Sequence, residues 1–317
     1  MSKYLITGGL GYVGSNLAKR LLENGEEVVI FDILPSSKSI ESFKDDVQVI
    51  QGQLGNMAEV LNAVQANDID CIYHLGAMIT MPAEANPWSA YNTNANGTYH
   101  ILEAARLFNV DSVVFPSGIV NYGREAPEVI TDDTFQSNPS QMYAVTKIFG
   151  ERLGEYYHHK FGVNFRCVRF PAICGPGRRE GLAAYASLMV HEAAKGRPCQ
   201  LPIDEKTQMP FLYIKDAVRC LTSLMNADEG TLSRRVYNID GFSVPAKEMA
   251  DTVLKYIPDA RIEFLADQNM VKLANDMPNK MDATKAREDW GWETEYDWDK
   301  VVQDFIAEVK AHPDFYK

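Results

Sequence analysis

The sequence predicts an α/β protein with a doubly wound parallel sheet and a smaller C-terminal lobe. Through the first half of the chain, short apolar runs alternate with stretches of helical periodicity. Such alternation is typical of parallel strands covered by helices on both faces. A glycine-rich segment directly after the first apolar run, leading into a helical stretch, supports the same fold class.

The first half contains five buried-strand candidates and four helix candidates. The strand candidates are "YLIT", "EVVIFD", "VQVIQG", "CIYHLGA" and "SVVFPS". Apolar residues recur at three- and four-residue spacing in the predicted helices, which lie at 14–24, 56–66, 89–108 and 139–161. The last of these leads into a further strand candidate, "NFRCVRFPA".

After about residue 172 the alternation loosens. We expect helices at 182–195, 214–226 and 245–256 and from about 299, with one strand at "RVYNI". The chain should therefore divide into a sheet-centred part at 1–172 and a smaller lobe that occupies most of 173–317. Some elements of the second part should join the sheet of the first.

Composition excludes several functional classes. The 317 residues carry a net charge of −12, which argues against a nucleic-acid partner because phosphate backbones need a basic face. The five cysteines are widely spaced and form no C-x-x-C, so we expect a reducing compartment and no zinc site. No run of 18 apolar residues occurs, so we expect no membrane partner and a cytoplasmic protein.

The glycine segment, "YLITGGLGYVGSNLAKRLL", places Gly8, Gly11 and Gly14 at three-residue spacing between a strand and a helix. Glycine permits the tight turn, the approach of a pyrophosphate to the backbone and close helix–strand packing. The diphosphate then lies at the positive end of the helix. The first part is therefore predicted to be a Rossmann domain that binds a dinucleotide, and the second a mainly substrate-binding lobe.

Asp32 indicates which dinucleotide binds. It ends "EEVVIFD", 18 residues after Gly14, where a carboxylate accepts from the adenine ribose hydroxyls and repels a 2′-phosphate. No arginine follows nearby, and only Lys38 offers a cation. We therefore predict NAD rather than NADP as the cofactor.

Tyr143 and Lys147 are candidate catalytic residues. They are four residues apart in a predicted helix and so share one face. A nearby ammonium favours the phenolate, so that Tyr143 would take the proton of a substrate hydroxyl while Lys147 also holds the nicotinamide ribose. Ser117, at the end of a predicted strand, is a candidate for a second hydroxyl at the site.

The chain resembles the extended short-chain dehydrogenases/reductases of the NAD-dependent epimerase/dehydratase family, closest in pattern to the L-threonine dehydrogenase-like branch. The matching motifs span almost the whole chain: "TGGLGYVGS", "YHLGA", "NTNANGTYHILEAAR", "YAVTK", "RFPAICGPG" and "DWGWETEYDWDKVVQDF". The resemblance implies a Rossmann fold, bound NAD, a Tyr–Lys catalytic pair and a homodimer formed through the helices near 89–108 and 139–161.

The candidate site residues follow from the motifs and this resemblance. We expect cofactor contacts from Gly8, Gly11, Tyr12, Val13, Gly14, Asp32, Leu75, Gly76, Ala77, Asn94, Lys147 and Phe170. Substrate contacts are expected from Thr80, Ser117, Tyr143, Arg178 and Arg179, the two arginines as ligands of a carboxylate or phosphate. No metal is expected.

One departure from the family pattern falls at the catalytic hydroxyl. The family writes "SS-[S/T]-x-x-x-Y-G", and this chain has "PSGIVNYG", with Gly118 where the hydroxyl belongs. Either Ser117, one place earlier, takes the role, or the site works with Tyr143 and water. We expect Ser117 to participate; a serine that only caps the end of a strand is the other interpretation.

Further departures concern the substrate. Met209 replaces the arginine with which nucleotide-sugar enzymes of the family clamp a diphosphate. Two substrate motifs of the threonine dehydrogenase branch have become "LAAYA" at 182–186 and "MPNK" at 277–280. We predict an NAD-dependent dehydrogenase of a small hydroxy compound: a hydroxy acid, amino acid or aldonate. The alternatives are a sugar or nucleotide-sugar epimerase, such as a UDP-glucose 4-epimerase-like enzyme, and a non-enzymatic dinucleotide-binding protein.

Overall fold

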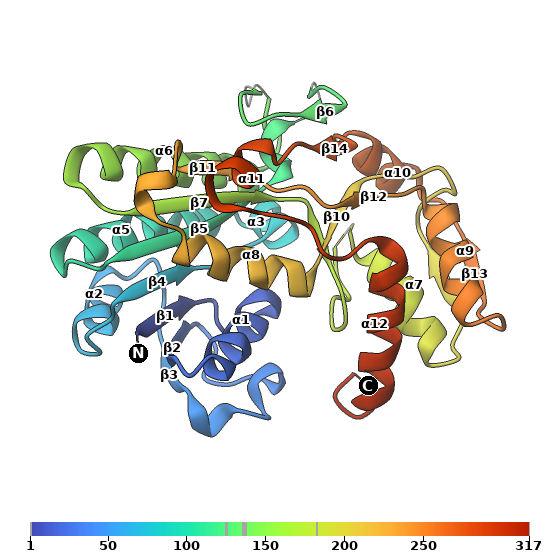
Figure 1. The fold of residues 1–317 in the computed structure, drawn as a ribbon, viewed down its shortest axis with the longest axis horizontal. Coiled ribbons are helices and arrows are strands. Elements are labelled where there is room, and N and C mark those ends of the chain that lie inside the picture. Colours follow the sequence, from blue (N-terminus) through green and yellow to red (C-terminus); the bar gives the residue numbers. More distant parts are fainter. Residues whose placement is uncertain (1, 124–125, 135–137, 182, 317) are drawn as a thin grey trace.

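A seven-stranded parallel sheet forms the centre of the molecule (Figure 1). The computed structural model describes the chain except residues 1, 124–125, 135–137, 182 and 317. In spatial order the strands are β3 (Gln48–Gln51), β2 (Glu27–Asp32), β1 (Lys3–Thr7), β4 (Cys71–His74), β5 (Ser112–Gly118), β7 (Phe165–Phe170) and β11 (Val236–Asn238). The strand order reverses between β1 and β4, where doubly wound sheets bind their ligands. The predicted fold class is confirmed.

Helices cover both faces of this sheet. One face packs against α1 (Tyr12–Glu23) and α8 (Ile214–Asn226), the other against α2 (Met57–Gln65), α5 (Gly97–Leu107) and α6 (Met142–Phe161). The alternation of side chains along β5 divides it between the two cores: Val114 packs on the α1 face, whereas Val113 and Phe115 pack on the α6 face. Ser117 has the same parity as Phe115, which places it toward α6.

The predicted strand "NFRCVRFPA" is two strands. Pro171 follows β7, and the chain leaves the main sheet there, because proline lacks the N–H that a central strand needs. The following strand, β8 (Ala172–Cys174), pairs with β10 (Pro210–Tyr213) in a separate three-stranded sheet completed by β12 (Phe242–Ser243). The loop after β8 is thereby held at the carboxyl edge of the main sheet.

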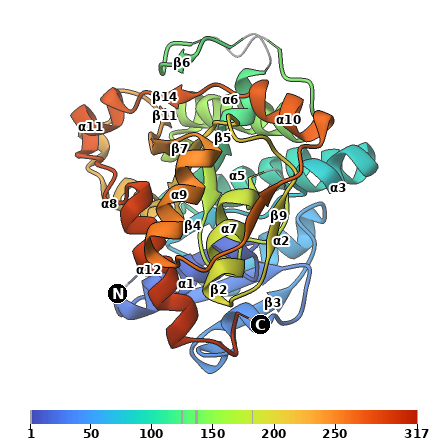
Figure 2. The same cartoon turned by 90° about the vertical axis from the view of Figure 1, so that its right-hand side faces the viewer.

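The remaining elements build the lobe at the right of Figure 1, which faces the viewer in Figure 2. Its helices are α7 (Ala184–Ala194), α9 (Ala246–Tyr256), α10 (Gln268–Asn275) and α12 (Trp298–Ala311), whereas α11 (Thr284–Trp290) lies beside β11 of the main sheet. Two small parallel pairs join distant segments: β9 (Cys199–Leu201) with β13 (Ile262–Phe264), and β6 (Val129–Ile130) with β14 (Lys280–Met281). The β6–β14 pair ties the first half of the chain to the second.

The predicted helix at 89–108 is not one regular helix. It consists of α4 (Pro87–Ala90), a π-helical stretch at Tyr91–Asn96 and α5. A short helix that periodicity did not indicate, α3 (Thr80–Ala85), precedes it. None of the helices in the described part of the chain is long and apolar enough to cross a membrane.

Candidate active site

The loop between β1 and α1 needs its glycines. Gly8 adopts a left-handed φ of +67°, and a Cβ there would lie 2.7 Å from the Cα of Gly76. A Cβ on Gly14 would lie 2.3 Å from the carbonyl oxygen of Gly8. Gly11 caps α1 without any side-chain hydrogen bond, so the first backbone amides of the helix are open to an anion. This cradle fits the diphosphate of a dinucleotide.

Asp32 lies at the end of β2 beside that loop. Its two carboxylate oxygens accept hydrogen bonds from the backbone amides of Leu10 and Leu34, each at 3.1 Å. The amide of Leu10 thus fixes the carboxylate against the glycine loop, and the charge stands at the C-terminal end of the strand, where an acid distinguishes a ribose hydroxyl from a phosphate. The residues present therefore fit NAD.

The loop after β4 forms the facing wall of the cleft. The Thr7 hydroxyl accepts a hydrogen bond from the backbone amide of Gly76 at 3.0 Å. Asn94 holds both backbone groups of Met78, at 2.8 and 2.9 Å, and donates to Thr146 at 3.0 Å. Asn94, predicted to contact the cofactor, here fixes the loop. The other predicted cofactor residues lie in α1, in this loop or at the end of β7: Tyr12, Val13, Leu75, Ala77 and Phe170.

Tyr143 and Lys147 lie on the stripe of α6 that faces the sheet. The Tyr143 hydroxyl has no hydrogen-bond partner among the described residues. Lys147 is buried, donates to the carbonyl oxygen of Pro116 at 2.8 Å and lies 5.7 Å from the centre of the Tyr143 ring. The helix thus brings the two predicted catalytic residues together, with the tyrosine hydroxyl free for a substrate.

Burial governs the ionisation of both residues. It raises the pKa of Tyr143 to about 12, and the charge of Arg178 acts against that increase. Burial also lowers the pKa of Lys147 to about 8. The charge of Arg178 thus favours the Tyr143 phenolate, and the expectation from the sequence that Lys147 does so stays a prediction.

Ser117 takes part in a buried network. Its Oγ accepts a hydrogen bond from the Asn121 side chain at 2.8 Å, and the same amide nitrogen donates to Glu151 at 2.7 Å. Glu151 in turn forms a two-point ion pair with Arg169, at 3.0 and 2.7 Å. No hydrogen bond joins Ser117 to Tyr143 among the described residues, so its direct role in catalysis stays a prediction.

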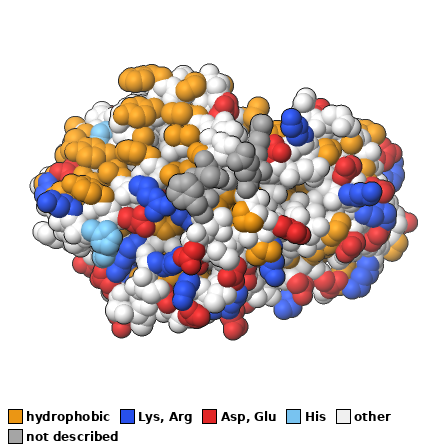
Figure 3. Space-filling model, turned by 90° about the horizontal axis from the view of Figure 1, so that it is seen from above, with side chains coloured by type: hydrophobic (Ala, Val, Ile, Leu, Met, Phe, Trp, Pro, Cys, Tyr) orange, Lys and Arg blue, Asp and Glu red, His pale blue; other side chains and the backbone are white. Residues whose placement is uncertain are grey.

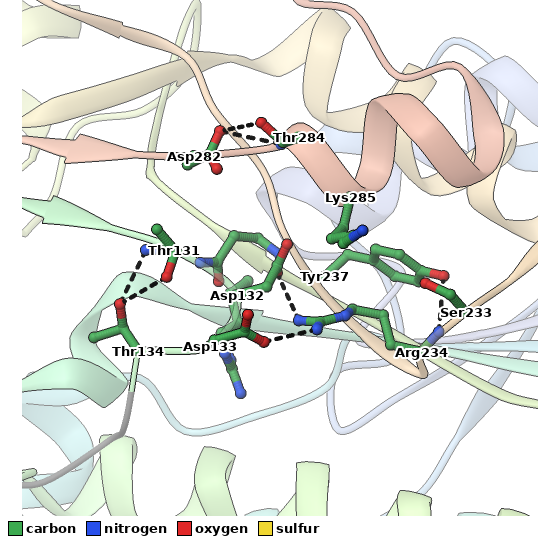
Figure 4. Close-up of polar contacts among 12 residues, drawn as sticks. Thr131, Asp132, Asp133, Thr134, Ser233, Arg234, Tyr237, Asp282, Thr284 and Lys285 are labelled. Atoms are coloured by element: carbon green, nitrogen blue, oxygen red, sulfur yellow. Dashed lines mark hydrogen bonds and ion pairs between the residues drawn. The ribbon is translucent and has the colours of Figure 1, made fainter.

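The network continues into the second half of the chain. Arg169 donates to the Tyr122 hydroxyl at 2.7 Å, and Tyr122 donates to the Asn238 side chain at 2.6 Å. The backbone amide of Asn238 donates to Asp132 at 2.6 Å. Figure 4 shows Asp132 and its neighbour Asp133 both facing Arg234, at 3.7 and 2.9 Å. One buried ion pair and a series of hydrogen bonds thus connect the end of β5 to the segment after β6.

Gly118 leaves open space at the catalytic position. Its backbone is extended, with a φ of −160°, a conformation that any residue adopts. A Cβ there would meet its nearest atoms, the Phe170 oxygen and the Val120 side chain, at 3.8 and 3.9 Å. The missing hydroxyl therefore reflects no constraint on the backbone, and space is left for a water molecule or a part of the substrate.

The predicted substrate residues fall into two groups. Thr80, at the start of α3, donates to Gln141 at 3.3 Å, directly before α6. Arg178 lies close enough to Tyr143 for its charge to affect the pKa of that residue. Arg179 instead donates to the backbone oxygen of Tyr316 at 2.7 Å, near the C-terminus. The two arginines thus differ, because Arg179 is held toward the C-terminus whereas the charge of Arg178 acts on Tyr143.

The sequence did not indicate three polar residues around the site: Asn121, Gln141 and Glu151. Glu151 had a detectable signal, because it lies two helical turns after Tyr143 on the same stripe, and a charged residue at a buried helix position requires a partner. Among the described residues, no cluster of three His, Cys, Asp or Glu side chains is arranged to hold a metal ion.

Comparisons with known proteins agree with this geometry. Residues 4–240 match the NAD dependent epimerase/dehydratase family. The mitochondrial L-threonine 3-dehydrogenase of Bos taurus is 31% identical over 95% of this chain and 80% of its own length. The L-threonine dehydrogenase structure from Clostridium difficile has 32% identity and a TM-score of 0.92, covering 100% of this chain and 99% of that one. A monomeric L-threonine 3-dehydrogenase from a metagenome has 25% identity and a TM-score of 0.89, over 97% and 99%.

Proposed function

The chain belongs to the NAD-dependent epimerase/dehydratase family, an enzyme family with NAD as its cofactor, and we propose that it is an NAD-dependent dehydrogenase of a small hydroxy compound. The observation that carries the proposal is the Tyr143 hydroxyl at the amino end of α6, which has no hydrogen-bond partner within the described ranges, with Lys147 one turn behind it. This pair stands beside a glycine cradle suited to a dinucleotide.

Each residue has a distinct task. Tyr143, as phenolate, takes the proton of the substrate hydroxyl, and NAD supplies the acceptor for the hydride. The Lys147 ammonium group donates a hydrogen bond to the Pro116 carbonyl oxygen, which fixes its position. The Arg178 charge favours the phenolate. The backbone amides at the start of α1 and the Asp32 carboxylate hold the cofactor.

The second hydrogen bond to the reacting oxygen has two candidate sources. The sequence favoured Ser117. The hydrogen bond that the Ser117 hydroxyl accepts from Asn121 instead supports a role in positioning the buried network. The open space at Gly118 supports a water molecule in the place of the missing hydroxyl. We propose the second arrangement, in which Tyr143 acts with water and Ser117 holds the network.

A nucleotide-sugar epimerase fits less well. Met209 stands where such enzymes have a diphosphate-clamping arginine, and its side chain is 3% exposed within the core of the molecule. A buried thioether offers neither charge nor hydrogen-bond donors to a diphosphate. The relatives named as L-threonine dehydrogenases make L-threonine the first compound to try, although Leu182, the first residue of the altered "LAAYA" motif, lies outside the described residues.

We also propose a homodimer through α4, α5 and α6. Large apolar side chains are exposed along these helices and the π-helical stretch between α4 and α5: Trp88, Tyr91, Tyr99, Leu107, Val145, Phe149, Tyr156 and Phe161. Figure 3 shows hydrophobic side chains gathered at the end of the molecule where α5 and α6 lie in Figure 1. Contiguous apolar surface of this kind marks an interface, and a second copy offers the same surface.

The five free thiols suit a reducing compartment, for which we propose the cytoplasm.

The function is tested by following NADH formation across a substrate panel. The panel contains L-threonine, 3-hydroxybutyrate, lactate and an aldonate beside UDP-glucose and GDP-mannose. The proposal expects NADH from at least one small hydroxy compound and none from the sugar nucleotides. Epimerised sugar nucleotide without net NADH would instead establish the epimerase. NAD binding with no reaction of any compound would favour a non-enzymatic dinucleotide-binding protein.

A further inference from the structure

Within the described residues, the Arg178 guanidinium group lacks the hydrogen-bond and ion-pair partners that the buried Arg166 and Arg169 have. It lies in the loop after β8 and is half-buried, and its Nε is buried without a hydrogen-bond partner. Its backbone amide donates to Gly175, but no described residue forms an ion pair or hydrogen bond with its guanidinium group. By contrast, Arg166 and Arg169 are fully engaged with carbonyl oxygens and a carboxylate.

Tyr12 presents a second unpartnered donor at the same place. Its hydroxyl is buried and has no hydrogen-bond partner in the described part of the chain. The loop of Arg178 lies against it, because a Cβ on Gly175 would come within 2.7 Å of the Tyr12 hydroxyl oxygen, and one on Gly177 within 3.6 Å of its ring. Any side chain on Gly175 would therefore close the space in front of this hydroxyl.

The charge of Arg178 also acts on the predicted base. Burial raises the pKa of the Tyr143 and Tyr12 hydroxyls, and the charge of Arg178 acts against that increase at both. The loop that carries Arg178 packs against the amino end of α1, where Gly175 and Gly177 approach the Tyr12 side chain. A buried donor without an acceptor costs free energy, which a bound acceptor would recover.

We propose that the Arg178 guanidinium and the Tyr12 hydroxyl bind the carboxylate of the substrate, so that the enzyme acts on small hydroxy acids rather than on neutral alcohols. This inference rests on the proposed dehydrogenase function and specifies its substrate class. The planar fork of arginine matches a carboxylate in two-point contact. Because the charge of Arg178 acts on Tyr143 as well, a carboxylate bound there would belong to the molecule whose hydroxyl Tyr143 deprotonates.

The same donors would also suit another anionic oxygen, in the diphosphate of the cofactor. The two sources differ in what the loss of Arg178 weakens. If the anion belongs to the substrate, only carboxylate binding to the protein–NADH complex suffers. If it belongs to the cofactor, NADH binding itself suffers.

The test uses Arg178→Met, with Arg261→Met as a matched control at an exposed position of the second lobe. Oxamate, malonate and acetoacetate, each beside its methyl ester, are titrated into the protein–NADH complex by NADH fluorescence. We expect at least one carboxylate to bind tenfold or more tightly than its ester. Arg178→Met should lose about 10–100-fold of that affinity, as expected for charge-assisted hydrogen bonds, with NADH affinity within threefold of the parent.

Arg261→Met should match the parent in every titration. Arg178→Lys, which keeps the charge without the fork, should retain part of the preference for acid over ester, and it replaces Arg178→Met if that variant does not fold. Esters that bind as well as acids would overturn the inference and leave the dehydrogenase standing. A tenfold loss of NADH affinity in Arg178→Met would assign the arginine to the cofactor instead. Absence of NADH binding in the parent would remove the proposed function itself.

Discussion

The Asn121 side chain donates to the Ser117 hydroxyl at 2.8 Å and to the Glu151 carboxylate at 2.7 Å through the same nitrogen. Ser117 is thereby held toward α6, together with the Glu151–Arg169 ion pair. The serine that stands next to the missing catalytic hydroxyl is thus part of a buried network that joins β5, α6 and β7. Ser117 either only holds this network or also donates to the reacting oxygen, and these two interpretations predict different kinetics for a Ser117 variant.

Removing the Ser117 hydroxyl should affect stability more than chemistry. Ser117→Ala leaves Asn121 one contact fewer, so we expect the free energy of unfolding to fall by about 1 kcal/mol and kcat to fall less than tenfold. Denaturant unfolding and steady-state NADH formation measure the two effects. A kcat loss of about 10²-fold with unchanged NAD affinity would show that Ser117 acts on the reacting oxygen.

Asp32 should set the choice of cofactor. The parent protein should bind NAD at least tenfold more tightly than NADP, because a fixed carboxylate repels a 2′-phosphate. Asp32→Asn keeps an acceptor for the Leu10 or Leu34 amide but loses the charge, and should narrow that preference. Titration calorimetry with both cofactors measures it. Equal or tighter NADP binding by the parent would refute the assignment.

Asp132 should make stability depend on pH. Burial raises its pKa from an ordinary value of 3.8 to about 6, so the folded protein holds this proton more tightly than the unfolded chain. Its contribution to stability is complete below about pH 4 and is lost as the pH rises through 6. Asp132→Asn retains an acceptor for the Asn238 amide. The variant should therefore lose less stability than the parent between pH 4 and 7, by at most about 3 kcal/mol.

Thermal and denaturant unfolding across this pH range measure the difference. Asp133→Asn is the control, because Asp133 is 85% exposed and bonds the same Arg234. Parallel stability curves for Asp132→Asn and the parent would show that Asp132 is not the group responsible.

The exposed face of α5 and α6 should hold a dimer together. Phe149→Glu introduces a charge at a 44% exposed apolar position, so an interface there would have to bury that charge. We expect sedimentation equilibrium to show a dimer for the parent and a monomer for the variant. Leu265→Glu, at a 55% exposed position of the other lobe, should remain dimeric. A parent that sediments as a monomer would rule out this interface.

The sequence predicted those parts of the site that depend on neighbours in the chain. Gly8, Gly14 and Asp32 follow from a strand, a turn and a helix in direct succession, and Tyr143 and Lys147 from one helical turn. The network around Asn121 could not be predicted, because it depends on contacts with Glu151, 30 residues later along the chain.

The same limit explains the two arginines after β8. Adjacent in sequence, Arg178 and Arg179 are indistinguishable by composition. The path of the loop brings Arg179 to the Tyr316 carbonyl oxygen and leaves the Arg178 Nε without a hydrogen-bond partner among the described residues. Pro171 gave a local signal that the strand ends, but which sheet β8 then joins depends on β10, almost 40 residues away.

The role of Tyr143 as the base is tested by comparing the parent with Tyr143→Phe in a single turnover with NAD and the most active small hydroxy acid of the panel. We expect the rate of NADH formation to fall about 10³-fold, as for loss of a general base, while the dissociation constant of NAD stays within twofold. Near-parental NADH formation by Tyr143→Phe would show that the proton leaves by another residue and that Tyr143 is not the base.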